Sequence, residues 1–193
     1  MGNVGKSSAA ALLVFFACYF SFSAAGKDDS SPVNTNSAKD NFQWMEHARL
    51  SWDDFKGAVN AAHDESAAAT YCAIGFKTNA AAPDGKQEII VYNTFYVNKS
   101  WVRTDAHIAS ILDHEQGHFD LCEIYTRQLR NRVHDIDPGA PGVKETLMHI
   151  YAEVSSEYEA RQQAYEQETI HGTDIANQKK WQQMIADELG LSL

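Results

Sequence analysis

The sequence predicts an α+β fold in which a small N-terminal β-sheet precedes three helices. Two observations support this prediction. Runs of β-forming residues separated by a turn follow residue 41, and apolar residues at helical spacing fill the second half of the chain. With 193 residues, 44% of them hydrophobic and 22% charged, the chain is long and apolar enough for one globular domain with a core.

The first 41 residues are set apart from this domain. Lys6, an apolar run and small residues up to Ala25 are typical of a secretory signal peptide over residues 1–25. A retained membrane anchor is the alternative, but the run is short for a span, and a lipid attached at Cys18 is a minority interpretation. Residues 26–41 are polar and turn-rich, which indicates a flexible linker, so the domain covers residues 42–193. We therefore expect an exported protein, periplasmic or secreted, without stable membrane insertion after signal removal.

The charge of the chain excludes one class of partner. The formal net charge is −10, and removing residues 1–25 takes away one Lys and no acid, which leaves −11. An acidic domain without a basic stripe argues against nucleic acid as a partner.

Export would leave two cysteines, Cys72 and Cys122. The sequence is compatible both with a disulfide between them and with two buried free thiols. The oligomeric state is not predicted.

The sequence of the first half of the domain predicts β-strands. Residues 69–78 and 88–97 are rich in β-formers, and a Pro-Asp-Gly turn lies between them, so an antiparallel hairpin is the simplest connection. Residues 48–57 add a short strand that ends in a turn.

The sequence of the second half of the domain predicts α-helices. Apolar residues at helical spacing predict a first helix over residues 104–134 and a second over residues 143–168. The sequence DIDPGAPG separates them, and HGTD (171–174) ends the second. A last helix with an apolar face closes the chain.

The sequence LDHEQGHFDL (112–121) carries the main chemical signal. On a helix, His114 and His118 lie about 40° apart around the axis, so both imidazoles can reach one ion. Glu115 lies about 100° from His114, beside that ion, where a carboxylate can take a proton from a metal-bound water. A solvated polar face is the plainer interpretation, but the histidines fall within an apolar stripe, and inward-facing polar groups are costly to bury without a bound cation. The stripe consists of Ile111, Leu121, Tyr125 and Leu129.

A catalytic zinc site needs a third protein ligand, and this helix does not supply it. The pattern H-x-x-G-x-x-H is absent, because Leu121 and Ile124 stand where its Gly and last His would be. Glu157 and Glu153 on the second helix, and His171 at the break that follows it, remain as candidates.

Several blocks of sequence resemble a bacterial family known as a domain of unknown function and described as predicted secreted Zn-dependent (HEXXH) proteases. The blocks are LSWDDFKG, FYVNKSWV, HEQGHFDLCEIYTRQLR and YEQETIHG, with Gln178 and Trp181 after them. The resemblance implies a zincin-like fold, Zn²⁺ as cofactor and a peptide or protein substrate. It also favours His171 as the third ligand.

These observations predict a secreted zinc metallopeptidase. His114, His118 and His171 are the expected zinc ligands, and Glu115 is the expected general base. Two alternatives stay open: a zinc hydrolase that acts on cell-wall peptides or amides, and a zinc-stabilised binding module without turnover.

Overall fold

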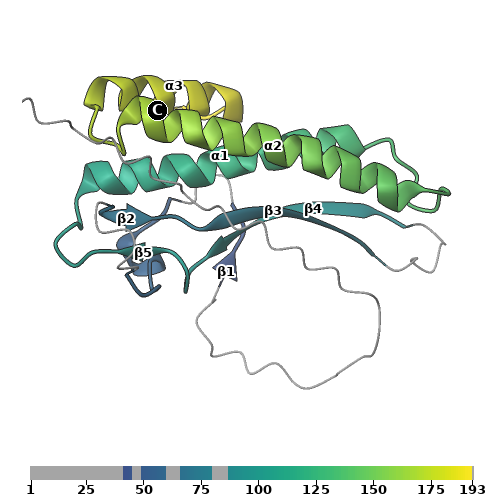
Figure 1. Ribbon diagram of the computed structural model, residues 1–193, viewed down its shortest axis with the longest axis horizontal. Coiled ribbons are helices and arrows are strands. Elements are labelled where there is room, and N and C mark those ends of the chain that lie inside the picture. The colour runs from purple at the N-terminus through teal and green to yellow at the C-terminus, as the bar shows by residue number, and fades with distance from the viewer. Residues whose placement is uncertain (1–40, 45–48, 60–65, 80–86, 193) are drawn as a thin grey trace, which may run out of the picture.

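The computed structural model describes residues 41–44, 49–59, 66–79 and 87–192, and these residues form an α+β arrangement (Figure 1). The predicted class is confirmed, because a small sheet is followed by three helices. The predicted signal peptide (1–25), nearly all of the predicted linker (26–41) and most of the Pro-Asp-Gly turn lie outside the described residues. Asn41, the last residue of that linker, already belongs to the first strand.

The main sheet is antiparallel, with strand order β1 (Asn41–Phe42), β4 (Ile89–Tyr96) and β3 (Cys72–Thr78). The predicted hairpin is confirmed, since Cys72 pairs with Phe95 and Thr78 with Ile89. A second pair joins β2 (Ala68–Ala69) to β5 (Trp101–Val102).

The short strand predicted for residues 48–57 is wrong for the part that the structure describes. Residues Trp52–Asp54 form a 3-10 helix, η1. The Asp54 carboxylate accepts hydrogen bonds from the Ser51 backbone N–H at 2.8 Å and from the Ser51 hydroxyl at 2.9 Å. These two bonds close a tight turn that an extended strand could not accommodate.

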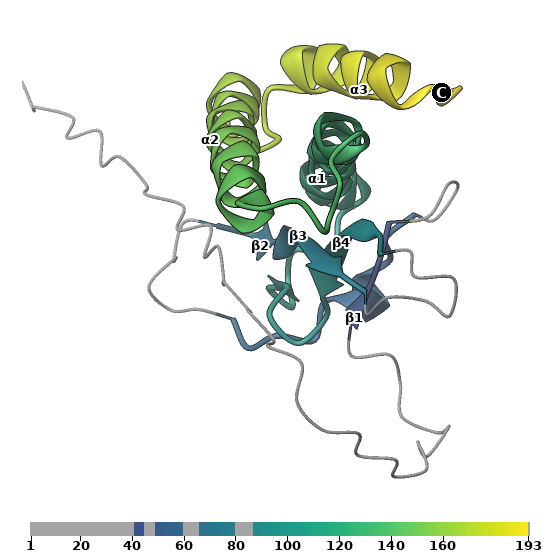
Figure 2. The same cartoon turned by 90° about the vertical axis from the view of Figure 1, so that its right-hand side faces the viewer.

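The first helix, α1 (Ala109–Val133), is the central element of the domain. Figure 2 views α1 nearly end-on, with the sheet below it, α2 (Val143–Thr169) on one side and α3 (Ile175–Leu189) above. Covered on three sides, α1 buries residues around most of its circumference, His114 and His118 among them. Within the described part of the chain, no helix is both long and apolar enough to span a membrane.

Two faces of α1 have different partners. Toward the sheet, Phe119 packs edge-on against Phe95 of β4 with ring centroids 5.3 Å apart, and the Asn93 amide donates to the Glu123 carboxylate. Toward α2, the rings of His114 and His118 both contact Tyr165. Packing against the sheet therefore fixes the rotation of α1 that directs its two histidines at α2.

Candidate metal centre

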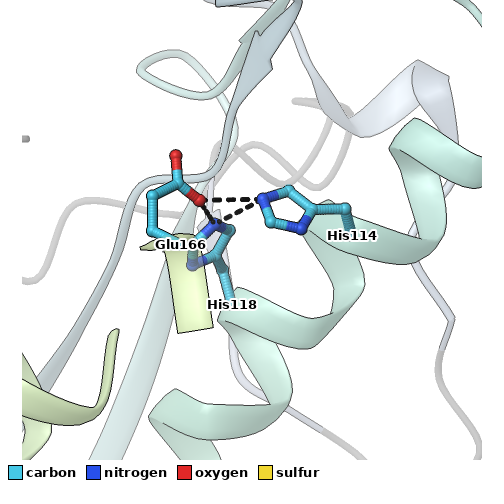
Figure 3. Close-up of side chains that lie close together, drawn as sticks. All are labelled: His114, His118 and Glu166. Carbon is cyan, nitrogen blue, oxygen red and sulfur yellow. Dashed lines mark hydrogen bonds and ion pairs between the residues drawn. The ribbon is translucent and has the colours of Figure 1, made fainter. Parts of the chain in front are cut away.

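Three side chains from α1 and α2 converge on one point (Figure 3). Nε2 of His114 and Nε2 of His118 lie 3.1 Å apart, and Oε2 of Glu166 lies 2.9 Å from the first and 3.2 Å from the second. Glu166 lies in the last turn of α2, three residues before its end at Thr169. Among the described residues, His114, His118 and Glu166 form a group that could hold a metal ion.

The dimensions of this triangle match those of a tetrahedral metal site. With zinc–ligand distances of about 2.0–2.1 Å, two ligand atoms of a tetrahedral site lie about 3.3 Å apart. The three edges here run from 2.9 to 3.2 Å. Two imidazole nitrogens that face each other at such a distance need a cation or a proton between them, because their lone pairs would otherwise repel each other.

Two glutamines fix which nitrogen of each histidine faces the centre. Nδ1 of His114 lies 3.1 Å from Oε1 of Gln178, and Nδ1 of His118 lies 2.5 Å from Oε1 of Gln162. Each glutamine is itself oriented, since Gln162 donates its amide N–H to the His118 carbonyl and Gln178 donates to the Tyr165 hydroxyl. Because both amide oxygens are acceptors, each Nδ1 carries a proton, and in a neutral ring Nε2 is the nitrogen whose lone pair faces the centre.

Tyr165 supports His114 from α2 and is fully buried. Its ring stacks on the His114 imidazole with centroids 4.8 Å apart, and its hydroxyl donates to the His114 carbonyl at 3.0 Å. The sequence HEQGH accommodates this contact through Gly117, where a Cβ atom would lie only 2.2 Å from the Tyr165 hydroxyl oxygen. Gly117 therefore lets α1 and α2 approach closely enough for Glu166 to reach the histidines.

The connection from α2 to α3 also packs on the centre. Ile170, His171 and Gly172 all have positive φ, at 49°, 55° and 76°. A Cβ atom on Gly172 would lie 2.8 Å from the Cβ atom of His114, so the loop backbone packs directly on His114. Left-handed backbone at a β-branched residue such as Ile170 is strained, and such strain is typical of functional sites.

The electrostatic interactions at the centre favour a positive charge there. Burial would raise the pKa of Glu166, but its hydrogen bonds and charge interactions with His114 and His118 outweigh that effect and hold the pKa well below its ordinary value. Burial would lower the pKa of His118, but Glu166 and, more weakly, Glu115 raise it to about 9. A buried carboxylate thus keeps a proton on the histidine pair, and a divalent cation could replace that proton.

Glu115 faces the interior next to His114. It is buried, and among the described residues its Oε2 has no hydrogen-bond partner. A buried carboxylate oxygen without a partner is costly, so in native proteins it is usually reserved for a ligand, a water or a reacting group. Because the charge of Glu115 acts on His118, this oxygen lies within electrostatic reach of the centre.

The structure brings together two of the three predicted metal ligands. His171 stands outside the converging group: its Nδ1 lies 2.6 Å from the other carboxylate oxygen of Glu166, and about half of its side chain is exposed. Glu157 and Glu153 lie elsewhere on α2, on an exposed face where both pair with Arg132.

Sequence reasoning missed Glu166 and Gln162. The available signal was their spacing of four residues on α2, in line with the buried positions Tyr158 and Thr169. A buried Gln at such a position indicates a specific hydrogen-bond partner.

Residues 93–172 match the family described as "Bacterial protein of unknown function (DUF922)". The matched segment contains the second half of β4, all of α1 and α2 and the loop up to Gly172, so it includes every residue of the converging group. The match confirms the resemblance to a bacterial family of unknown function. No curated protein and no solved structure shows a significant match to this chain.

Proposed function

We propose that this protein is a secreted zinc metallopeptidase with a zincin-like active site. The observation that supports this most is the convergence of His114, His118 and Glu166 on one point, beside a buried carboxylate oxygen of Glu115 that has no partner among the described residues. Two histidines with an oxygen ligand, their far nitrogens oriented by hydrogen bonds, are a donor set typical of catalytic zinc.

Each residue then has a defined role. His114, His118 and Glu166 hold the ion, so Glu166 takes the place that the sequence favoured for His171. Zinc bound there would supply an acidified water and polarise the scissile carbonyl. Glu115 accepts the proton of the attacking water and passes it to the departing amine nitrogen. Gln162, Gln178 and Tyr165 keep both imidazoles in one orientation while this proton moves.

The ligand count favours an enzyme over a zinc-stabilised binding module. Structural zinc sites are normally closed by four protein ligands, whereas catalytic sites use three and keep one position for water. In the part of the chain that the structure describes, three residues converge. A hydrolase that acts on cell-wall peptides or amides would use the same residues, so the substrate class has to be decided by assay.

The test measures both the zinc content and the hydrolytic activity of the parent protein and its variants. The purified protein should carry about one zinc ion, and Glu166→Ala should lose it. Glu115→Gln should keep the zinc and lose hydrolysis of an unfolded protein, of short peptides or of cell-wall peptides. Glu145→Gln, at an exposed position of α2, is the matched control and should behave as the parent.

The alternatives make different predictions for the same experiment. Zinc binding without turnover of any substrate, in the parent and Glu115→Gln alike, would indicate the binding module. A parent protein that binds no zinc would refute all three functions.

A further inference from the structure

We propose that His171 is a positioning residue that holds one oxygen of Glu166, so that only the other oxygen faces the metal. This inference rests on the zinc site proposed above. It assigns to His171 a different role from the ligand role that the sequence favoured.

The Glu166 carboxylate is divided between two sets of partners. Oε2 lies 2.9 and 3.2 Å from the two ligand nitrogens of His114 and His118. Oε1 lies 2.6 Å from Nδ1 of His171. The His171 Nδ1 therefore holds the one carboxylate oxygen that does not contact the two histidines of α1.

The backbone fixes His171 in this place. Its N–H donates to the Glu166 carbonyl at 3.1 Å, so backbone and side chain of His171 both bind the same residue. A residue five positions further along a regular helix would lie on another face, but the left-handed turn at Ile170, His171 and Gly172 brings the imidazole back over Glu166.

The turn is anchored at both ends. Thr169 accepts the Gly172 N–H at its side-chain oxygen and the Asp174 N–H at its carbonyl. Asp174 in turn caps α3 by accepting from the N–H groups of Ala176 and Asn177. These contacts oppose relaxation of the strained residues, so the position of the His171 ring is imposed by the fold.

The division of the carboxylate has a chemical consequence. Glu166 bound through one oxygen leaves a fourth position of a tetrahedral site for water. Released from His171, Glu166 could bind through both oxygens, which raises the coordination number and competes with that water. We therefore expect His171 to set the coordination number as well as the affinity of the site.

The experiment distinguishes the effect of the His171–Glu166 hydrogen bond on zinc binding from the effect of the backbone turn that carries His171. His171→Gly and His171→Asn both tolerate positive φ, but only Asn offers an N–H donor close to the position of Nδ1. Zinc affinity is measured on the full chain by competition with a chelator, and coordination by the visible absorption of the cobalt(II)-substituted protein, which is stronger for four ligands than for five. Ile170→Gly alters the same turn without touching the contact and is the control.

We expect His171→Gly to bind zinc about 10–100-fold more weakly and to show weaker cobalt absorption, as is usual when a residue that orients a ligand is lost. His171→Asn should restore most of both, and Ile170→Gly should resemble the parent. Parent-like affinity and absorption in His171→Gly would refute the positioning role. Loss of metal in both His171 variants as complete as in His114→Ala would make His171 a ligand instead. A parent that binds neither metal would refute the proposed function itself.

Discussion

Replacing Gly117 by Ala should destabilise the protein and weaken its metal site, although Ala is the better helix former. On an isolated helix this change would be favourable by about 1 kcal/mol. In the folded protein the added Cβ atom would lie 2.2 Å from the Tyr165 hydroxyl oxygen and 2.7 Å from Cζ, whereas ordinary contact begins at 3.4 Å. The tertiary contact therefore opposes the helix propensity.

The magnitude follows from how firmly Tyr165 is held. Its side chain is fully buried, and its hydroxyl donates to the His114 carbonyl and accepts from Gln178. Forcing extra volume into a packed core costs about 1–3 kcal/mol, and losing the two hydrogen bonds costs about 1 kcal/mol each. Subtracting the propensity gain of about 1 kcal/mol leaves a net loss of about 2–4 kcal/mol in the free energy of unfolding.

Urea unfolding of the metal-free protein measures this loss, and chelator competition measures zinc affinity, which should fall because His114 moves with Tyr165. Ser156→Ala, at an exposed position of α2, is the control for helix propensity and should change stability only slightly. A Gly117→Ala variant as stable as the parent, with unchanged zinc affinity, would refute the argument that Gly117 sets the distance between α1 and α2.

Four further predictions concern the centre and its loop. Because the pKa of His118 is raised to about 9 in the metal-free protein, zinc binding at pH 7.5 should release about one proton from this histidine, and about half a proton at pH 9. Calorimetry in buffers of different ionisation enthalpy measures this release. For the same reason the metal-free protein should lose stability as the pH rises from about 6.5 to about 9, which melting temperatures would show. Gln162→Leu removes the acceptor at Nδ1 of His118 and should weaken zinc binding about 10–100-fold in chelator competition. Ile170→Gly, at a strained and largely exposed position, should raise the free energy of unfolding by about 1 kcal/mol in urea titrations.

The elements that were predicted well are those in which apolar or β-forming residues follow a regular pattern along the chain. The second helix, predicted over 143–168, is α2 at Val143–Thr169, and the predicted hairpin is β3–β4. The first helix begins at Ala109 rather than at residue 104, because residues 103–108 are not helical and contain a turn at residues 104–105. There the Ala106 N–H donates to the Arg103 carbonyl, and Arg103 pairs with Asp105. Such contacts between neighbours stop a helix without changing the hydrophobic pattern by which it is recognised.

The same distinction explains which residues of the candidate site were predicted: those fixed by local spacing were found, and the one fixed by a tertiary contact was not. His114 and His118 share one helix, so their spacing of four residues was enough to bring them together. The third position depends on how α2 lies against α1, and that distance is set by the contact between Gly117 and Tyr165. No spacing within α2 records this distance, and the alignment of Glu166 with buried positions of α2 is too weak a signal to select it over Glu157, Glu153 and His171.

His171, at the break HGTD, was predicted to be the third metal ligand, but the turn there places its ring against the Glu166 carboxylate. A ligand supplied from a loop would have to hold its own geometry against the mobility that loops usually have. Here Glu166 lies inside a helix, held by regular backbone hydrogen bonds, and the loop residue His171 restrains only the rotation of its carboxylate. Helices thus provide all three converging groups, which keeps their positions precise, while the strained turn supplies a single contact from outside. The helix break and the family resemblance both favoured His171, and neither could show that this histidine would contact the carboxylate of Glu166 rather than a metal ion.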